Sequence, residues 1–233
     1  MELDWSNQSS HIRTLYRPWQ PGDGYEEATI TAAETQLDVH LPTPLRTFYR
    51  AWGRRHDLTQ TRDCLLAPHE LVVQADALIF CVENQATYYW AVQREFLEKS
   101  NPPIVAAAAE SERSVWEVQS TLTWRPSHAH LSDFLDDLTY ENAFSGGAVH
   151  GGFSENFHPQ GYQVAWLERH WRHATVTPMC FGLEPGAVYT GSPLYVRDGQ
   201  ALSWGYRCYA AVREAEALDE ISQALQTTWV QRW

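Results

Sequence analysis

Ten histidines make metal binding the first chemistry to consider in this sequence. Three pairs lie close together along the chain: His128 with His130, His150 with His158, and His170 with His173. None of them has the spacing of a zinc-binding helix, in which a general-base glutamate follows the first of two histidines. We therefore expect surface or interface histidines, with no metal and no cofactor. A hydrolase or metal enzyme that uses His150, His158 or His170 remains an alternative.

Nucleophilic catalysis has weaker support. Ser145 precedes Gly146 and Gly147, but it lacks the preceding glycine and the strand-turn-helix context of a nucleophile elbow. The sequence also contains neither a Walker phosphate loop nor the glycine-rich dinucleotide fingerprint. We predict no catalytic residue.

Carboxylates are the densest chemical feature of the chain. Asp133, Asp136, Asp137 and Glu141 recur at spacings of three and four without a Lys or Arg among them. In a helix these spacings place them close together, and we expect a solvated face. A cationic partner would relieve their repulsion. Reversing Asp136 and Asp137 together should then leave the thermal melt nearly unchanged and weaken a partner complex.

Aromatic residues supply a second set of candidates. Tyr88 and Trp90 alternate with Tyr89 along a predicted strand, so part of this set should face outward. Tyr and Trp often dominate binding energy at protein interfaces. We take Tyr88 and Trp90, with Glu83 and Asn84 of the adjoining turn, as partner-binding candidates.

The charge of the whole chain indicates the class of partner. Seventeen Lys and Arg against 29 Asp and Glu give a formal net charge of −12 among 233 residues. This balance disfavours nucleic acid and anionic membranes and favours encounter with a basic protein. The chain shows neither a signal-peptide pattern nor an apolar run of about 20 residues, so we expect a cytoplasmic protein without a membrane span. We expect its four cysteines to be reduced core thiols.

The elements that must position these residues begin with an arm, 1–28, predicted to lie over the surface. A capping box from Thr31 to Glu34 predicts the start of a helix that ends near Leu41, and a second helix should run from Pro44 to Gly53. Further along we expect a strand at 64–66, a short helix at 68–74, strands at 77–82, 87–92, 104–109 and 114–119, and a helix at 131–138. This order predicts an α+β fold, with helices packed on one side of an antiparallel-rich sheet.

Beyond Phe144 the pattern changes. Gly146, Gly147, Gly151 and Gly152 predict a loop, and a histidine-rich stretch with a partly exposed helix carrying His170 and His173 follows. Strands are expected at 175–181, 187–189, 194–197, 201–204 and 206–212, with a hairpin turn at 198–199 and a helix at 215–225. Residues 145–233 should form a C-terminal α+β extension that continues the sheet or makes a small lobe.

Residues 29–144 resemble the SUKH superfamily, which includes fungal cell-wall assembly regulators and bacterial immunity proteins. The resemblance rests on Leu41-Pro42, on the hairpin around Glu83-Asn84-Gln85, and on the apolar patterns of Glu34-x-x-Leu37, Leu45-x-x-Phe48-Tyr49, Leu65-Leu66, Val115-Trp116 and Leu131 to Leu135. Asp38 stands where a glycine commonly follows the first helix of the family.

The resemblance implies a non-catalytic protein. Bacterial members are antidotes that bind and neutralise toxins of contact-dependent or polymorphic systems, often nucleases. We therefore expect an immunity protein that binds a basic protein toxin. A scaffold or regulatory interaction protein on the same fold remains open.

Overall fold

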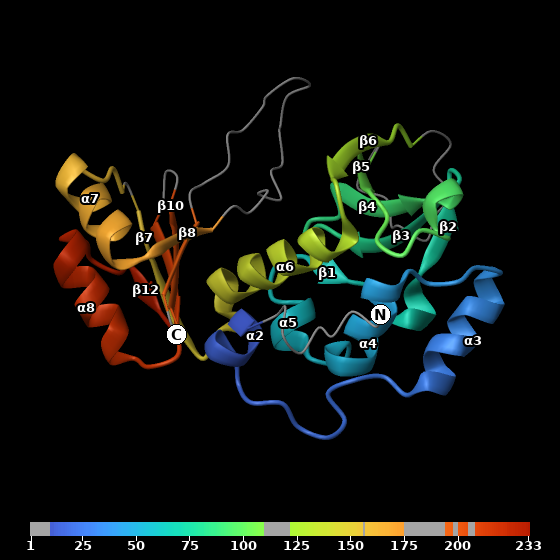
Figure 1. Cartoon of the computed structure of the whole chain (residues 1–233), viewed down its shortest axis with the longest axis horizontal. Coiled ribbons are helices and arrows are strands. Elements are labelled where there is room, and N and C mark those ends of the chain that lie inside the picture. Colours follow the sequence, from blue (N-terminus) through green and yellow to red (C-terminus); the bar gives the residue numbers. More distant parts are fainter. Residues whose placement is uncertain (1–9, 110–121, 156, 175–193, 198–199, 205–207) are drawn as a thin grey trace.

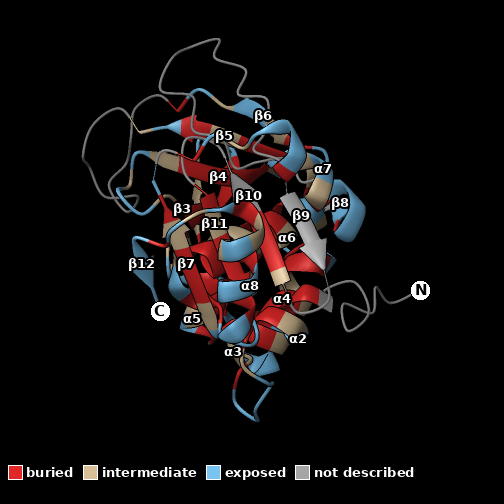
Figure 2. Ribbon diagram, turned by 90° about the vertical axis from the view of Figure 1, so that its left-hand side faces the viewer, coloured by how far each residue is buried: buried red, intermediate tan, exposed pale blue. Residues whose placement is uncertain are grey.

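A computed structural model describes residues 10–109, 122–155, 157–174, 194–197, 200–204 and 208–233. Its helices and strands confirm the α+β class. Among the described residues the strands form two six-stranded antiparallel sheets, one from each half of the chain (Figure 1). Buried residues lie along the strands and on the inner sides of the helices (Figure 2).

The first sheet has the order β1-β3-β4-β5-β6, with β2 paired to β3. The predicted hairpin at its centre is confirmed. β3 is buried along its whole length because the sheet is covered on both faces there. The predicted strand at 114–119 lies outside the described residues, and β6 was not expected. The strands are β1 (Cys64–Leu65), β2 (Val72–Gln74), β3 (Ala77–Val82), β4 (Tyr88–Gln93), β5 (Ile104–Ala108) and β6 (Arg125–His128).

The helices of this half are α3 (Glu27–Leu37), α4 (Thr43–Trp52), α5 (His56–Thr59) and α6 (Leu131–Asn142), and short 3-10 turns occur at η1 (Pro68–Glu70) and η2 (Arg94–Phe96). The predicted apolar face of α4 is confirmed, since Leu45, Phe48, Tyr49 and Trp52 are all buried. The hydroxyl of Tyr49 donates to the carbonyl of Leu66 over 2.6 Å, which fixes α4 against the start of the sheet.

The predicted capping box is wrong. α3 begins at Glu27, so Thr31 lies inside the helix. The carboxylate of Glu34 instead accepts the N–H of Leu41 over 2.9 Å and binds Arg46 of α4. Asp38 ends the helix with a left-handed φ of 52°, a conformation that glycine adopts most easily.

Residues 11–16, part of the predicted surface arm 1–28, pack into the fold instead of lying over its surface. Helix α2 (Ser10–Leu15) buries Ile12 and Leu15, and Tyr16 after it is also buried. The hydroxyl of Tyr16 binds the carbonyl of Thr139 in α6, and an imidazole nitrogen of His11 lies 2.6 Å from the Thr139 hydroxyl. Polar contacts to α6 thus hold this segment inside the fold.

The second sheet has the order β12-β7-β11-β10-β9-β8. The arms of the predicted hairpin at 194–204 are confirmed. The predicted strands at 175–181 and 187–189 lie outside the described residues. The elements are β7 (His150–Ser154), α7 (Gly161–His170), β8 (Arg172–Ala174), β9 (Leu194–Arg197), β10 (Gln200–Trp204), β11 (Cys208–Val212), α8 (Glu216–Leu225) and β12 (Gln231–Arg232).

Two expectations for this half are wrong. Gly151 and Gly152 lie in β7 rather than in a loop. A Cβ at Gly151 would lie 2.2 Å from the Trp233 ring, and one at Gly152 would lie 2.9 Å from the Gln231 carbonyl oxygen. His173 lies on β8 rather than on the helix of His170. Among the described cysteines, Cys81 and Cys208 are free and buried as expected, and Cys64 is free but partly exposed.

The second sheet lies between the α7 and α8 pair and the central helices (Figure 1). α2 joins the two halves: the carbonyl of Leu15 accepts the N–H of Val149 over 2.9 Å, and that of Arg13 accepts the Arg213 guanidinium over 3.2 Å. Ala201 and Ala211 belong to the same core as the first sheet. Within the described residues, no helix combines the length and apolarity that crossing a membrane requires.

The glycine pair in β7 gives a stability prediction. A Cβ at Gly151 would lie 2.2 Å from the Trp233 ring, whereas one at Gly161 would have no atom within 4 Å. We expect Gly151→Ala to lower the free energy of unfolding by about 1–3 kcal/mol, the usual cost of overpacking. Gly161→Ala is the matched control and should be neutral or slightly stabilising in urea unfolding. Equal effects of the two changes would contradict the tight packing of Trp233.

Candidate functional site

The candidate site is built on one face of α6, because the predicted partner-binding carboxylates follow one another along it. Asp133, Asp137 and Glu141 are four residues apart and form a single stripe, with Asp136 beside it. Asp133 is exposed, while Asp136 and Glu141 are partly exposed. Asp137 is only 3% exposed. The predicted solvated face is therefore wrong at Asp137, and reversing its charge would not be a surface change.

Asp137 is buried against His128 of β6. Their Oδ2 and Nε2 atoms are 3.0 Å apart, and the imidazole is 1% exposed. The ring of Phe134 packs edge-on against the imidazole at 5.1 Å. A buried carboxyl needs such a partner, because an unpaired charge away from water costs several kcal/mol.

A β-bulge brings Ser127 into the same chain of hydrogen bonds. Ile104 pairs with His128 and Val105 with Pro126, which leaves Ser127 as the extra residue. Its Oγ lies 2.7 Å from Nδ1 of His128. A serine, a histidine and an aspartate in line match the arrangement of an activated nucleophile. Because the imidazole is inaccessible, it could not transfer a proton to a leaving group, and we interpret the chain as a support for α6.

Burial and mutual repulsion shift the pKa values of these carboxyls. Burial raises the pKa of Asp137 to about 9, and the charges of Glu141 and Asp133 add to the effect. Burial also raises the pKa of Asp136 to about 7, with Asp137 and Asp133 contributing. Oδ1 of Asp136 is buried and has no hydrogen-bond partner. These groups therefore take up protons at neutral pH instead of remaining fully ionised.

The turn between β3 and β4 holds two further candidates. The carboxylate of Glu83 accepts the backbone N–H groups of Gln85 and Thr87, and the Thr87 hydroxyl, over 2.8, 3.3 and 2.9 Å. Glu83 thus stabilises its own turn, while Asn84 is exposed at its tip. Asn84 is the more accessible residue for a partner.

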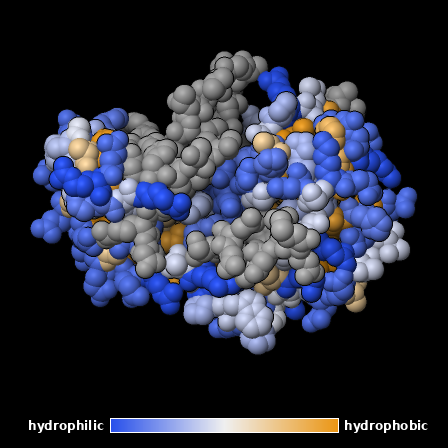
Figure 3. Space-filling view, in the orientation of Figure 1, coloured by the Kyte–Doolittle hydropathy of each residue, from blue (hydrophilic) through white to orange (hydrophobic). Residues whose placement is uncertain are grey.

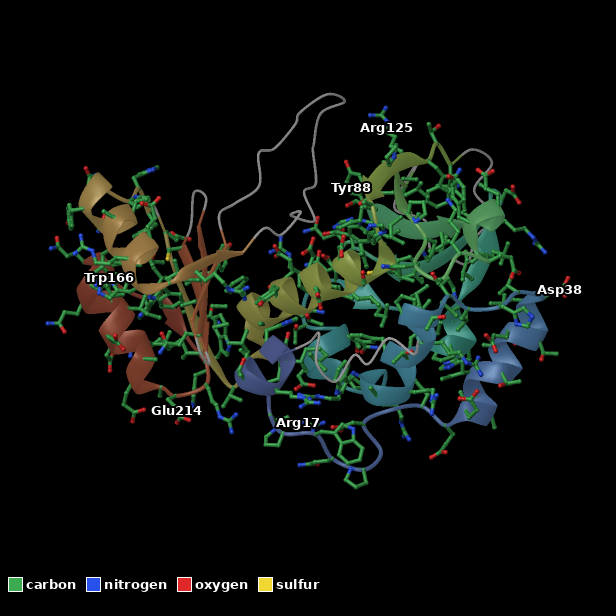
Figure 4. The ribbon with its side chains drawn as sticks, in the orientation of Figure 1. Arg17, Asp38, Tyr88, Arg125, Trp166 and Glu214 are labelled. Atoms are coloured by element: carbon green, nitrogen blue, oxygen red, sulfur yellow. The ribbon has the colours of Figure 1, made fainter. Side chains whose placement is uncertain are left out.

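The two aromatic candidates differ. Trp90 is 2% exposed and packs against Phe134, with ring centres 5.6 Å apart, so the expectation that it anchors a partner is wrong. The reason is that β4 is buried on both faces at this point. Tyr88, labelled in Figure 4, lies at the start of β4 and is partly exposed, so it stays a candidate.

Asp63, which no sequence pattern indicated, connects the turn with α6. It immediately precedes β1, and Cys64 pairs with Val82, so Asp63 lies beside Glu83. It is fully buried, and neither carboxylate oxygen has a hydrogen-bond partner of ordinary geometry. Burial raises its pKa to about 7. Arg62 opposes this shift, Glu141 adds to it, and the Asn84 backbone and Glu83 have smaller effects in opposite directions.

Arg62 corrects the expectation that the acidic stripe lacks a local cation. Its guanidinium pairs with Glu141 over 3.2 Å. The amide of Asn142, next in α6, accepts the backbone N–H of Arg62 and donates to the Leu58 carbonyl. The structure thereby joins the two predicted groups into one carboxyl cluster, which we define as Asp63, Glu83, Asp133, Asp136, Asp137 and Glu141.

Two histidines of the predicted pairs have partners elsewhere in the fold. His128 is engaged with Asp137, and His170 contacts the Trp166 carbonyl over 2.7 Å through Nδ1. Within the part of the chain that the structure describes, no three His, Cys, Asp or Glu side chains are placed to hold a metal ion.

The buried pair of His128 and Asp137 gives a pH-dependent prediction. His128→Ala should lower the free energy of unfolding by about 1–3 kcal/mol at pH 8, because it leaves the protonated carboxyl of Asp137 buried without its hydrogen-bond partner. Asp137→Asn should cost less, since the amide keeps the shape and can accept the imidazole N–H.

The sign of the pH effect follows from the raised folded pKa. A carboxyl with a folded pKa above its unfolded value binds its proton fully below the unfolded pKa, and that stabilisation is lost as pH rises toward about 9. Because the imidazole no longer stabilises the ionised carboxyl, the deficit of His128→Ala should grow as pH rises through about 9, and in urea unfolding it should be smaller at pH 7 than at pH 10. A deficit that does not change with pH would argue against an ionisable partner.

No family model, curated protein or solved structure matches this chain. A functional assignment therefore rests on these residues and their geometry.

Proposed function

We propose that this protein is a SUKH-like antidote, which binds a basic protein toxin through the carboxyl cluster and neutralises it without chemistry. One observation carries the proposal: six carboxyls of the described residues lie together on α6, the β1 start and the β3–β4 turn. Arg62 is the only Arg or Lys in the described part of the chain that pairs with them. A scaffold role on the same fold is the alternative outcome of the test below.

The exposed members of the cluster provide the contacts. Asp133 is exposed, and Glu83, Asp136 and Glu141 are partly exposed; beside them, Asn84 is exposed and Tyr88 is partly exposed. Hydrophilic residues also cover most of the surface that is coloured in Figure 3. Such a surface recognises a cationic partner mainly through charge, which raises the association rate and excludes neutral or acidic partners.

A basic partner gains more here than from isolated surface carboxylates. The carboxyls of α6 repel one another, and burial keeps part of each group from water. A Lys or Arg placed against Asp133 and Asp136 would offset that repulsion. Nuclease toxins that grip phosphates present such cations, and an antidote to them would act in the cytoplasm.

Matched charge changes test the surface. Asp133→Lys should weaken binding of a toxin encoded beside this gene by about tenfold or more, with a larger effect at low salt. Glu214→Lys changes the charge equally on the β11–α8 connection beside the second sheet, where Figure 4 labels Glu214, and should have little effect. Asn84→Lys and the exposed Gln20→Lys form a second pair.

Isothermal titration and rescue of toxin-expressing cells are the two measurements. Equal losses from both members of each pair would show a general charge effect and exclude the cluster as the contact surface. Failure to rescue cells from any neighbouring toxin would favour the scaffold.

A further inference from the structure

Asp63 is the most unusual group in the cluster. It is fully buried, and neither carboxylate oxygen has a hydrogen-bond partner of ordinary geometry, although the Asn84 backbone lies near enough to oppose the rise of its pKa in part. An ionised carboxylate in that state would be strongly destabilising, because burial favours the neutral form. Some ligand must therefore neutralise it.

The surroundings of Asp63 exclude every neutralising cation larger than a proton. A metal ion would need several donors, and no such group occurs among the described residues. A Lys or Arg of another protein could not reach a side chain with no exposed surface. The neighbouring guanidinium of Arg62 already forms an ion pair with Glu141. A proton is the only cation small enough for the site.

The groups facing Asp63 come from α6, β1, β3 and the β3–β4 turn, where the Asn84 backbone favours the ionised form. Glu141 lies on α6 and Glu83 in the β3–β4 turn, and both favour the protonated form. The thiols of Cys64 on β1 and Cys81 on β3 feel the charge of Asp63 and have pKa values raised mainly by burial. Arg62 is the one cation of the described chain whose charge favours ionisation of Asp63.

We infer that Asp63 is a proton-binding site whose occupancy sets the position of the Arg62 guanidinium. With the proton bound, Arg62 stays on Glu141, as the structure shows. When the proton leaves to solvent, the new carboxylate draws Arg62 toward itself and away from Glu141. The Arg62 side chain is 37% exposed, so it has room for this movement. No covalent bond changes.

The pKa of about 7 places this exchange in the neutral range. Release of Arg62 leaves Glu141 as an unpaired anion on the partly exposed side of α6. This consequence rests on the proposed function: the carboxyl cluster would become more negative as pH rises, and a basic toxin would bind more tightly at pH 8 than at pH 6.

Carbon-13 titration of side-chain carboxyls in the full-length protein tests the site without any partner. We expect Asp63 to titrate near neutral pH, and Glu141 to show a second inflection at the same pH. That inflection should vanish in Asp63→Asn. It should persist in Asp133→Asn, the control, in which an exposed carboxyl on the helix of Glu141 is removed. Titration of Asp63 near the ordinary aspartate value of about 4 would overturn the inference, as would a Glu141 inflection that survives Asp63→Asn.

Urea unfolding supplies a second measurement. The folded pKa of Asp63 lies above its unfolded value of 3.8, so its proton stabilises the fold at low pH and this contribution is lost as pH rises from about 4 to 7. The unfolding constant of the wild type should rise with pH, by at most about tenfold per unit for each proton. In Asp63→Asn the logarithm of the unfolding constant should rise less steeply with pH, because one fewer proton is released on unfolding. An unchanged slope would contradict the inference.

Toxin binding separates this inference from the proposed function. If the carboxyl titration succeeds and no toxin binds, the proton site stands and the antidote proposal fails. If a toxin binds with the same pH dependence to the wild type and to Asp63→Asn, the proton on Asp63 does not control binding at the carboxyl cluster.

Discussion

The cost of withdrawing carboxyl groups from water governs the centre of this structure. α6 lies in the middle of the molecule between the two sheets (Figure 1), and its acidic stripe could not all remain in solvent. Each carboxyl is compensated differently. Asp137 has both an imidazole partner and a pKa raised to about 9, and Glu141 has a guanidinium. Asp136 and Asp63 each have an unpartnered oxygen and a pKa raised to about 7, so protons provide their compensation.

The same helix links the halves of the chain. Thr139 of α6 forms hydrogen bonds with Tyr16 and His11 of the N-terminal segment. The ring of Tyr140 stacks on the His11 ring, with ring centres 4.2 Å apart. The widened turn η3 (Ala143–Gly147) then leads from α6 into β7, and its Phe144 packs near Tyr209 of the second sheet. Contacts of high sequence separation therefore determine which side of α6 faces solvent.

Local patterns in the sequence predict elements, whereas tertiary contacts decide exposure. The hairpin of β3 and β4, the apolar face of α4 and the existence of α6 follow from periodicity and are confirmed. Periodicity could not show that β4 is covered on both faces at Trp90. It also could not place His128 against Asp137, because that contact depends on a bulge opposite Ile104.

Residues with little sequence signal were missed for similar reasons. Asp63 lies in a polar stretch before a two-residue strand, and only the pairing of β1 with β3 puts it beside Glu83. Gly151 and Gly152 are typical of a loop until Trp233 and the Gln231 carbonyl are seen to fill the space above them. The acidic stripe of α6 was predictable, but its division into exposed and buried members and its junction with Asp63 and Glu83 were not.

That division bears on how the charge of the protein acts. The formal charge of −12 counts every carboxyl as ionised, and protons on Asp63, Asp136 and Asp137 would change it by three, to −9. Charge that serves only solubility is less costly on the surface, where Glu216 of α8 lies. Carboxyls held out of water lower the free energy of unfolding and so destabilise the protein. Groups with shifted pKa values concentrate at functional sites. This cost distinguishes the carboxyl cluster from the remaining acidic surface, and it supports the proposal that a cationic partner binds there.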